Sequence, residues 1–508
     1  MDSQTHSKII WSEKAEDKMK EAPAFIRPMI IKKVESLARE KEIKIITEDF
    51  LNDVRNKQKH SPTKKTKIIN DFFAKTDDKP IYAGFYSKAN VHAGMSGSPV
   101  DFDNISEVWN KVAEKKDNSP RRAVYIHVPF CLSRCKFCHF YKSRTREEEI
   151  DIYSKYLLKE LQFASESNFA KSKPINAIYF GGGTPTDLSP DSLKNLLSHL
   201  KNNWNLANDC EITIEGRIFG FNDEKISACI ENGANRFSFG VQSFDTKIRR
   251  QMGRIETQEN IISRINDIAK LNQSAISVDL IYGLPDQTDE IWINDLAIAA
   301  NTNSIDSCSI YNLKLMAGTP ILQESQNGKY SAPADMKRQA DMFLLMNDYY
   351  KSRNIKRFGL RHWAFSNRER SLYNFIVKYE QTCLPIGNGA GGRIGNYRVF
   401  QSCENKDYYK KIDAGEKPIA MALELPENNT INGALIGSLE EHLCIDFAKI
   451  ESEFNLPQLT EKFLPLLNQW QEAGMISLKN KVMRLTAAGE FWNVNVAQNL
   501  IDYLKSEI

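Results

Sequence analysis

The sequence predicts an α/β protein whose core is a partial (β/α)6 barrel of the TIM type, with a small helical domain before it and a winged-helix-like domain after it. Two observations support the barrel. Short apolar runs of the strand type alternate with helical stretches between residues 123 and 313, and polar or glycine-rich segments follow these runs. The last domain is predicted from two short apolar runs near the C-terminus, which a turn separates and helical patterns flank.

The chain has 508 residues, more than a single core usually supports, so several domains are expected. The 68 Lys and Arg residues nearly balance the 65 Asp and Glu residues, and a net charge of +3 gives no reason to expect a nucleic-acid or membrane partner. The nine cysteines show no pairing pattern, the first residues have no apolar core, and no apolar run reaches about 18 residues. These features predict a cytoplasmic protein.

Residues 9–56 are predicted to form the small helical domain. Ser12 is expected to cap a first helix that ends near residue 21, Pro23 to begin a second, and Thr47 to cap a third. The segments Trp11-Ser-Glu-Lys-Ala and Ala22-Pro-Ala-Phe-Ile-Arg resemble the small domain attached to the light-independent protochlorophyllide reductase subunit, which implies tetrapyrrole chemistry. A general helical docking module is the alternative, because the fold of an accessory domain does not determine its ligand.

The remaining boundaries follow from composition and periodicity. Residues 57–78 are rich in polar residues and predict a solvated linker, and residues 79–122 predict a connecting segment. The barrel core is expected over residues 123–355, with helices such as 151–165 and 190–200 and with strands at 123–128, 177–180, 211–215, 236–239, 277–281 and 306–313. Residues 356–424 are expected to form a substrate-proximal extension, and residues 425–508 the C-terminal domain.

Three cysteines, Cys131, Cys135 and Cys138, fall within eight residues just after the first predicted strand. Thiolate ligands select zinc, copper(I) or an iron–sulfur cluster. A [4Fe–4S] cluster held by three cysteines keeps one iron open for reaction. The alternative is a structural zinc site completed by His127 or His139, although structural zinc usually takes its ligands as two separated pairs.

The segments that follow the next strands carry further candidate residues, as expected of a barrel whose active residues lie at the C-terminal strand ends. In the turn Gly181-Gly-Gly-Thr-Pro185, the missing Cβ atoms let backbone groups approach a ligand closely. The third strand ends in Glu215, whose carboxylate can accept a hydrogen bond from a ribose hydroxyl or an ammonium group. A surface charge is the ordinary alternative for a lone Glu.

This C-x3-C-x2-C triplet, with an aromatic residue before its third cysteine, resembles the radical S-adenosylmethionine (SAM) enzymes. The segments Tyr125-Ile-His-Val-Pro-Phe-Cys, Ser238-Phe-Gly-Val-Gln-Ser-Phe and Asp279-Leu-Ile-Tyr-Gly-Leu-Pro are similar to those of their oxygen-independent coproporphyrinogen III dehydrogenase subgroup. The resemblance implies that the three cysteines hold a catalytic [4Fe–4S] cluster, and that SAM is cleaved to methionine and a 5′-deoxyadenosyl radical. It implies that one SAM contacts Tyr125, Gly182 and Glu215, and that a second contacts Phe137, Gly183, Thr184, Gln242, Arg254 and Asp279. The chain departs from the dehydrogenase at Phe140, where that enzyme has a further cysteine.

Segments beyond the sixth strand, including Arg361-His-Trp and Arg368-Glu-Arg-Ser-Leu-Tyr-Asn, resemble the anaerobic heme-degrading radical SAM methyltransferases of the anaerobilin synthase group. Those enzymes use SAM as radical source and as methyl donor, open the porphyrin without oxygen, and release iron with a linear methylated tetrapyrrole. The resemblance implies heme or a related tetrapyrrole as substrate and a low-potential electron donor of the flavodoxin or ferredoxin type. His139 departs from the small residue expected after the third cysteine.

Heme is a flat apolar disc with two carboxylates and an iron. A guanidinium group matches a carboxylate in two places, so the candidates for pairing with the carboxylates are Arg361, Arg368 and Arg370. Trp363 is a candidate for packing on the ring, and His362 or Tyr373 for the axial position of the iron, with an ordinary buried pair as the alternative for His362 and Trp363.

The C-terminal domain resembles that of the dehydrogenase and is expected to act as a lid. Two other functions stay open at this point. One is the dehydrogenase reaction itself. The other is heme delivery by a chaperone of the same subgroup, whose members share the cysteine triplet and the barrel but lack the Arg-His-Trp and Arg-Glu-x-x-Leu-Tyr-Asn segments.

Overall fold

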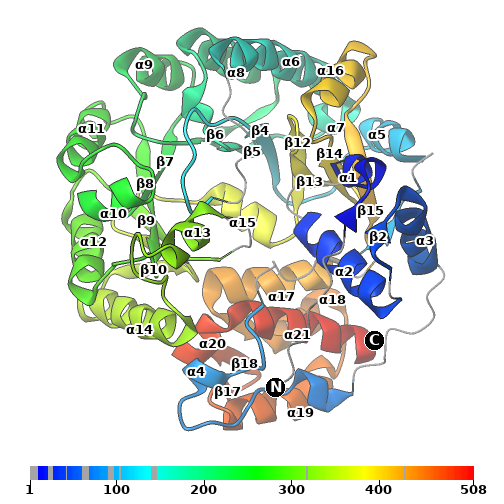
Figure 1. The fold of residues 1–508 in the computed structure, drawn as a ribbon, viewed down its shortest axis with the longest axis vertical. Helices are drawn as coiled ribbons and strands as arrows, with labels where there is room; N and C mark the ends of the chain where they lie inside the picture. Colours follow the sequence, from blue (N-terminus) through cyan, green and yellow to red (C-terminus); the bar gives the residue numbers. More distant parts are fainter. Residues whose placement is uncertain are drawn as a thin grey trace.

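The computed structural model describes residues 10–20, 27–41, 43–59, 68–89, 97–101, 104–138, 146–315, 319–427 and 429–507. At its centre is a curved sheet in which strands β4 to β9 lie side by side in sequence order and run parallel, with helices along the outer side (Figure 1). The predicted α/β class and partial barrel are confirmed.

Each predicted barrel strand is present, within a few residues of its expected position. The strands are β4 (Arg122–Val128), β5 (Ile175–Gly182), β6 (Leu206–Gly216), β7 (Arg236–Gln242), β8 (Ala275–Tyr282) and β9 (Ser307–Asn312). Most are longer than predicted, because pairing continues beyond the apolar run into polar residues. Gln242, for example, lies beyond the predicted strand 236–239 and pairs with Leu280 on the neighbouring strand.

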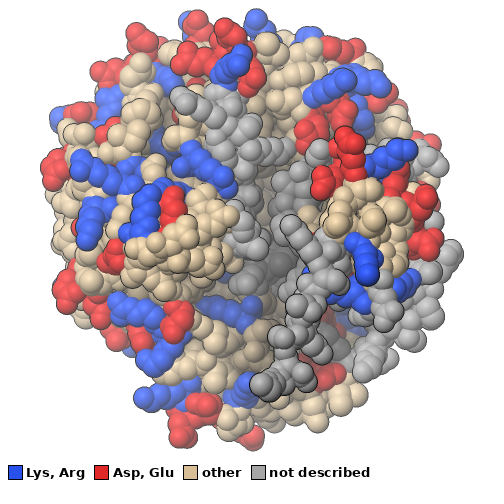
Figure 2. Space-filling model, viewed as in Figure 1, with Lys and Arg blue, Asp and Glu red and all other residues tan. Residues whose placement is uncertain are grey.

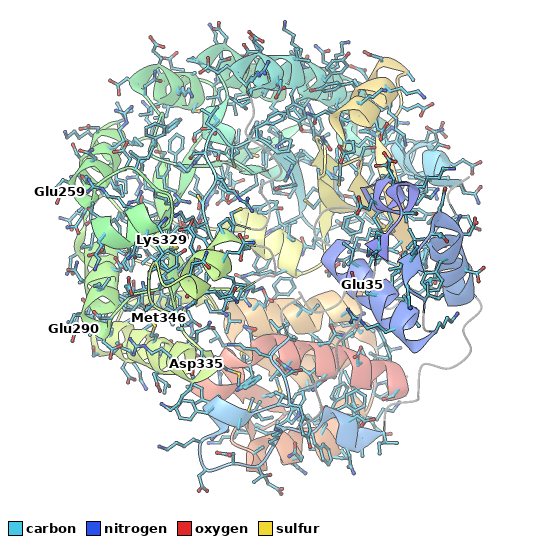
Figure 3. All side chains as sticks on the ribbon, in the orientation of Figure 1. Glu35, Glu259, Glu290, Lys329, Asp335 and Met346 are labelled. Carbon is cyan, nitrogen blue, oxygen red and sulfur yellow. The ribbon has the colours of Figure 1, made fainter. Side chains whose placement is uncertain are left out.

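Most of the helices between these strands, α7 to α12, begin at side-chain caps. Ser189 accepts a hydrogen bond from Ser192 N at the start of α8, which confirms that cap. Glu259 and Glu290 lie in the first turns of α11 and α12, at the outer edge of the molecule (Figure 3). The helices of this region are α6 (Glu147–Ser165), α7 (Asn168–Lys171), η3 (Pro185–Asp187), α8 (Pro190–Asn203), α9 (Asp223–Glu231), α10 (Thr246–Gln251), α11 (Gln258–Lys270), α12 (Asp289–Asn301), α13 (Pro320–Gln326) and α14 (Met336–Ser352).

Residues 356–424, predicted as a substrate-proximal extension, extend the sheet at both edges. At one edge β10 (Lys356–Gly359) and β11 (His362–Ala364) add antiparallel to β9. At the other edge β12 (Thr382–Ile386) pairs parallel with β4, and the antiparallel strands β13 (Gly391–Ile394), β14 (Tyr397–Gln401), β15 (Ile419–Glu424) and β3 (Ser98–Pro99) continue the sheet. Helix α16 (Asn405–Asp413) lies beside α6 on the outer side, where Tyr409 stacks on Tyr156 with ring centroids 4.2 Å apart.

Residues 366–378 close the N-terminal end of the barrel. Helix α15 (Leu372–Lys378) lies within the curve of the strands (Figure 1). The N–H groups of Leu372 and Tyr373 donate to the Glu211 carboxylate on β6, at 3.1 and 3.3 Å. On the same helix, Ile376 packs with alanines from the first halves of β4 and β5. This segment is the barrel floor.

The C-terminal domain has the predicted winged-helix-like arrangement. Strands β17 (Ile476–Lys479) and β18 (Val482–Leu485) form a hairpin whose turn residues Asn480 and Lys481 have φ of 52° and 62°, as a tight two-residue turn requires. Strand β16 (Cys444–Asp446) pairs with β18. The helices are α17 (Asn429–His442), α18 (Phe447–Phe454), α19 (Leu459–Glu472), α20 (Ala487–Phe491) and α21 (Asn493–Glu507).

The N-terminal domain is helical, as predicted. It contains α1 (Glu13–Lys20), α2 (Arg27–Glu40) and α3 (Glu48–Lys59), with β1 (Ile10–Trp11) parallel to β2 (Ile45–Ile46). Ser12 and Thr47 accept hydrogen bonds from the N–H groups of Ala15 and Phe50, which confirms both caps. The predicted helix start at Pro23 lies outside the described residues. Trp11 donates to Glu35 on α2 at 3.2 Å, and the domain has a small core of its own (Figure 3).

Residues 68–89, here called the strap, pack against the C-terminal domain. The strap contains η1 (Ile69–Phe72) and α4 (Pro80–Ala83). The Gln469 side chain exchanges two hydrogen bonds with the backbone of Ala74, and the indole N–H groups of Trp470 and Trp492 donate to strap carbonyls at 3.0 and 2.9 Å. The segment 68–78 is therefore held on the C-terminal domain through Phe72 and Ala74, whereas residues 57–78 were predicted to form a solvated linker. Helix α5 (Ile105–Ala113) follows and packs on β15.

The described surface carries mixed charges, and the cysteines form no disulfide. Lys and Arg side chains are interspersed with Asp and Glu side chains on the face shown in Figure 2, without a large patch of one sign. None of the nine cysteines, all within the described ranges, is in a disulfide, and of the six scattered ones only Cys444 is not buried. Among the described helices, none combines the length and the apolar character needed to cross a bilayer.

Candidate active site

The cysteine loop begins where β4 ends, at the C-terminal end of the barrel. Cys131 and Cys138 are half-buried and Cys135 is buried. The Cys131 Sγ atom lies 3.3 Å from the Thr184 hydroxyl, and Cys138 N donates to Cys135 O at 3.1 Å in a tight turn. In the described part of the chain, no three His, Cys, Asp or Glu side chains surround a single metal-ion position. A [4Fe–4S] cluster does not need such a point, because each cysteine binds a different iron.

The thiols fit such a cluster by their chemistry. All three are soft donors on one loop, and the charges of Cys131 and Cys138 act on each other. Burial raises the pKa of the Cys131 thiol to about 11, so this thiol keeps its proton until a metal replaces it.

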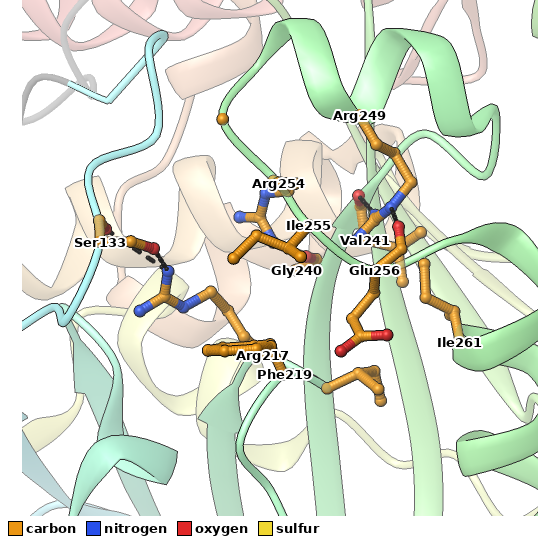
Figure 4. A pocket seen from close by; sticks show the side chains of 12 residues that line it. Ser133, Arg217, Phe219, Gly240, Val241, Arg249, Arg254, Ile255, Glu256 and Ile261 are labelled. Atoms are coloured by element: carbon orange, nitrogen blue, oxygen red, sulfur yellow. Dashed lines mark hydrogen bonds between the residues drawn. The ribbon is translucent and has the colours of Figure 1, made fainter.

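A buried arginine braces the loop from the end of β6. Arg217 donates to the Ser133 hydroxyl at 2.6 Å (Figure 4). It also donates to Asp187 Oδ2 at 3.1 Å. Asp187, which follows the glycine turn, accepts a further hydrogen bond from Leu132 N at 3.0 Å. Arg217 and Asp187 are therefore positioning residues for the cysteine loop, and sequence reasoning assigned them no role.

Two short helices hold the other side of the loop. Lys136 N donates to the Met252 carbonyl at the end of α10, and the Lys136 carbonyl accepts from Ile321 N on α13, both at 3.1 Å. The Lys136 ammonium also pairs with Glu324 of α13. The cysteine loop is thus fastened to the segments that follow four other strands of the barrel, β5, β6, β7 and β9.

The glycine turn serves packing as well as access, which corrects the sequence argument. A Cβ atom on Gly183 would lie 2.3 Å from the Phe130 carbonyl, and one on Gly182 would lie 2.5 Å from the His127 ring. The space beside these glycines is filled by the chain's own β4 and cysteine loop. The glycines therefore let the second loop pack directly on the first.

The interior of the barrel contains stacked tyrosines and a carboxyl group. Tyr179 lies 4.6 Å from Tyr373 and 6.4 Å from Tyr125, measured between ring centroids. Glu215 accepts a hydrogen bond from the Tyr179 hydroxyl, and burial, with the neighbouring charge of Asp279, raises its pKa to about 8. Tyr125, Tyr179 and Glu215 are each partly exposed although they point inward, so the interior is open to small molecules above this level.

The residues predicted to contact a second SAM come together beside the cysteine loop. The Arg254 guanidinium lies 5.7 Å from the Phe137 ring centroid and donates to the Gly240 carbonyl. Gln242 lies nearby with a φ of 73°, a strained conformation of the kind found at functional sites, at an irregularity between β7 and β8. Burial raises the pKa of Asp279 to about 6, while Arg236, His362 and Arg254 act in the other direction.

The three side chains of the Arg361-His-Trp segment lie in three different places. Arg361 stands at the barrel rim, where its charge acts on both Tyr282 and Tyr311. His362 points into the barrel, with its Nδ1 atom 2.9 Å from the Ser309 hydroxyl. Trp363 points to the outer side, where it packs on Tyr350 of α14. The alternation of side chains along β11 causes this separation, so Trp363 does not share the interior with His362.

Arg368, Arg370 and Tyr373 belong to the barrel floor, which corrects their predicted substrate contacts. Arg368 donates to the Ser274 carbonyl just before β8 at 2.6 Å, and Arg370 pairs with Asp209 at the start of β6. Both arginines therefore lie at the opposite end of the strands from the cysteines. Tyr373 is stacked below Tyr125 and Tyr179. His139 and Phe140 lie outside the described residues.

A buried polar network above the floor was missed by sequence reasoning. Glu369 receives two hydrogen bonds from Arg236 and one from the Ser307 hydroxyl, and lies 3.7 Å from His362. The alternating Ser307 and Ser309 of β9 were the one available signal, because polar residues at every second position mark an inward-facing side of a strand. His362 is held in this network, away from the strand ends where the cysteines lie.

Between the cysteine loop and the ends of β6 and β7 is a pocket of about 370 Å³ (Figure 4). Ser133 and the guanidinium groups of Arg217, Arg249 and Arg254 contribute to its wall. Burial, followed by the charge of Arg254, lowers the pKa of Arg249. The lining also contains the carboxylate of Glu256, and Arg217 pairs with Asp187, so the three guanidinium groups give this pocket only a net excess of positive charge.

Comparison with known families agrees with this geometry. Residues 125–297 match the model of the radical SAM superfamily, and residues 11–55 match that of the proto-chlorophyllide reductase 57 kD subunit. A solved structure of coproporphyrinogen III oxidase from Escherichia coli shares the fold with a TM-score of 0.68, at 23% identity over 84% of this chain and 98% of that one. As a radical SAM protein, the chain binds a [4Fe–4S] cluster and SAM.

Two curated relatives extend over almost the same length. The oxygen-independent coproporphyrinogen III oxidase of Helicobacter pylori is 26% identical over 83% of this chain and 95% of its own length. The anaerobilin synthase of Escherichia coli O157:H7 is 34% identical over 85% of this chain and 95% of its own length. The chain therefore belongs to the anaerobilin synthase family of radical SAM enzymes.

Proposed function

We propose that this enzyme degrades heme without oxygen, using SAM both as radical source and as methyl donor, and that it opens the macrocycle and releases iron from a linear methylated tetrapyrrole. The observation that carries the proposal is the 34% identity to an anaerobilin synthase across 95% of that relative. The cysteine loop and the open barrel interior beside it support a radical SAM site for a large flat substrate.

In this proposal Cys131, Cys135 and Cys138 hold the cluster, which when bound supplies the electron that splits SAM. Tyr125, Gly182 and Glu215 contact the first SAM. Tyr125 is oriented by a 2.9 Å hydrogen bond to His127, and Glu215 by the Tyr179 hydroxyl. A Glu215 carboxyl group that is protonated below about pH 8 can donate as well as accept a hydrogen bond.

A second SAM is proposed beside Phe137, Gly183, Thr184, Gln242, Arg254 and Asp279. The proximity of Arg254 to Phe137 and Gln242 supports this grouping, since the cysteine loop meets the end of β7 and the segment after it there. Arg254 and the partly protonated Asp279 would then receive the carboxylate and amino groups of that molecule.

At the substrate end, Arg361 keeps its proposed role toward a heme carboxylate. His362 is proposed as a positioning residue rather than an axial ligand, because the Glu369 and Ser309 side chains hold it. The electron donor is proposed to be a flavodoxin or ferredoxin, in the cytoplasmic location predicted from the sequence.

The second candidate is oxygen-independent coproporphyrinogen III oxidation, which the 26% identity over 95% of the Helicobacter pylori enzyme favours. Phe140, in place of that enzyme's further cysteine, speaks against it. The test is an anaerobic reaction of the cluster-loaded protein with SAM, a reductant and either hemin or coproporphyrinogen III. Loss of the heme absorbance with a methylated product of matching mass supports heme degradation. Vinyl products from coproporphyrinogen, with hemin unchanged, would replace it with the second candidate, and stable hemin binding without turnover would indicate a chaperone.

A further inference from the structure

A second cavity, of about 580 Å³, lies outside the barrel interior at its C-terminal rim. Its walls come from parts of the chain that are far apart in sequence. The outer side of β8 and β9 contributes Tyr282, Ile310 and Asn312, and α14 contributes Phe343 and Met346. The start of α21 and the end of the strap complete it. A hollow with aromatic walls and a few polar groups has the chemical character of a ligand site.

The charged groups of the lining are mostly cations. Among the described residues, the wall contains Lys88 of the strap, Lys314 after β9, Arg361 at the rim, and one carboxylate, Glu490. Glu490 is engaged by Arg357, at 2.7 Å. In the described part of the chain, no carboxylate forms an ion pair with Lys88 or Arg361. The charge of Glu440 acts on Lys314, so the excess of positive charge in the cavity lies with Lys88 and Arg361.

The structure holds Lys88 in place at an electrostatic cost. Its ammonium group lies 3.0 Å from the ring centroid of Phe491 and 6.0 Å from that of Trp492. Burial, and then the charges of Arg361 and Lys314, lower the pKa of Lys88 to about 7. Like charges brought together in a partly buried cavity raise the free energy of the empty protein, and a bound anion relieves this repulsion.

Arg361 connects this cavity with the barrel interior. Its charge acts on Tyr282, which faces the cavity, and on Tyr311, which faces the interior and is 42% exposed. One of its N–H groups reaches Asn493 of the C-terminal domain at 3.4 Å. An anionic group attached to a ligand in the barrel mouth can therefore meet the charge of Arg361, which lines the cavity together with Lys88 and Lys314.

We infer that the cavity binds the propionate carboxylates of the tetrapyrrole, with Lys88, Lys314 and Arg361 as the cationic partners. The inference rests on the proposed heme-degrading function. The guanidinium group suits a carboxylate in two places, while each lysine supplies a compact charge. The strap and the C-terminal domain thereby take part in substrate recognition, and Lys88 is its specificity-determining residue on the strap.

The test measures hemin binding to the cluster-loaded full chain without reductant, by titration of the heme absorbance. Hemin is compared with hemin dimethyl ester, which has the same ring without carboxylates. Lys88→Met and Arg361→Met should each weaken hemin binding by about tenfold or more, the loss of one charge-assisted interaction, and leave ester binding as in the unaltered protein. Ester binding also shows that each variant is folded.

Lys75→Met is the matched control. Lys75 lies on the same strap with its ammonium group 4.1 Å from the ring centroid of Tyr86, but does not line the cavity. This variant should bind both ligands like the unaltered protein, and Lys88→Arg should retain hemin affinity within about threefold because the charge remains.

The outcomes distinguish failure of the propionate site from failure of the proposed heme-degrading function. If Lys88→Met and Arg361→Met bind hemin as tightly as the unaltered protein, which degrades it, the propionate site is wrong and the function stands. If the unaltered protein neither binds nor degrades hemin, the function fails. Inorganic phosphate is the competing anion. If phosphate binding depends on Lys88 while hemin binding does not, the cavity takes a free anion and the inference is overturned.

Discussion

Replacement of Arg217 by methionine removes the side chain that ties the cysteine loop to the loop after β5. Methionine keeps much of the apolar length of the arginine but loses the hydrogen bonds to the Ser133 hydroxyl, 2.6 Å, and to Asp187, 3.1 Å. The Arg217 and Asp187 side chains are 11% and 4% exposed, so solvent replaces little of what is lost. Asp187 keeps Leu132 N as its hydrogen-bond donor.

Hydrogen bonds to charged groups contribute about 1.5 to 3 kcal/mol each, and removal of one partner of a buried ion pair costs about 3 to 5 kcal/mol. We take about 3 kcal/mol as the lower estimate of the energy that holds the loop closed, which corresponds to about a hundredfold change in an opening equilibrium. Because the cysteines lie on this loop, the opening exposes the cluster. Iron should therefore leave the Arg217→Met protein about a hundredfold faster than the unaltered protein.

The assay follows iron release to a ferrous chelator under anaerobic conditions, after cluster loading and without SAM. Arg264→Met is the control, since Arg264 also makes hydrogen bonds to a carbonyl, Phe221 O, and to a carboxylate, Asp223, but on the outside of the barrel. Asp187→Asn combined with Arg217→Met should recover part of the loss, because no lone buried charge remains. If iron leaves Arg217→Met within about threefold of the control, the bracing argument is wrong.

Three further predictions concern other parts of the chain. Cys135→Ala should abolish SAM cleavage, measured as 5′-deoxyadenosine, and undiminished cleavage would refute the cluster assignment. The pKa of Glu215 is raised to about 8, so the folded state holds this proton more tightly than the unfolded state does. The proton's contribution to the stability of the fold is therefore complete below about pH 4.5 and is lost as the pH rises to about 8. The melting temperature of the SAM-free protein should accordingly fall relative to Glu215→Gln across that interval, and an unchanged difference would contradict the shift. Lys417→Met should lower the free energy of unfolding by about 3 to 5 kcal/mol in a denaturant titration, because the fully buried Glu160 then loses its cation. Adding Glu160→Gln to that variant should restore part of the lost stability. A loss below about 1 kcal/mol would contradict the ion-pair argument.

Short-range features of this chain were accessible from the sequence. The barrel strands, the Ser12, Thr47 and Ser189 caps and the C-terminal hairpin each depend on residues within one element or one turn, so that propensity and periodicity predict them. The cysteine triplet is equally local. Its three thiols need no distant segment to identify them as a metal-binding loop.

The positions that the sequence misplaced depend on distant packing partners. The segment of Arg368 and Tyr373 is rich in polar and aromatic residues, yet it forms the barrel floor because Glu211, more than a hundred residues earlier, caps the helix that follows. Trp363 faces outward because its strand pairs with β9 in one register, and a shift of one residue would exchange it with His362.

The sequence by itself determined the strand order, the cysteine loop and the kind of cofactor chemistry, because these are written in contiguous residues. Tertiary structure alone decided which end of the barrel each polar segment occupies, how Arg217 braces the cysteines, and that Lys88 and Arg361, far apart in sequence, line one cavity. The physical reason is that these contacts depend on how elements distant in sequence pack together, and no local pattern of charge or hydrophobicity encodes that packing.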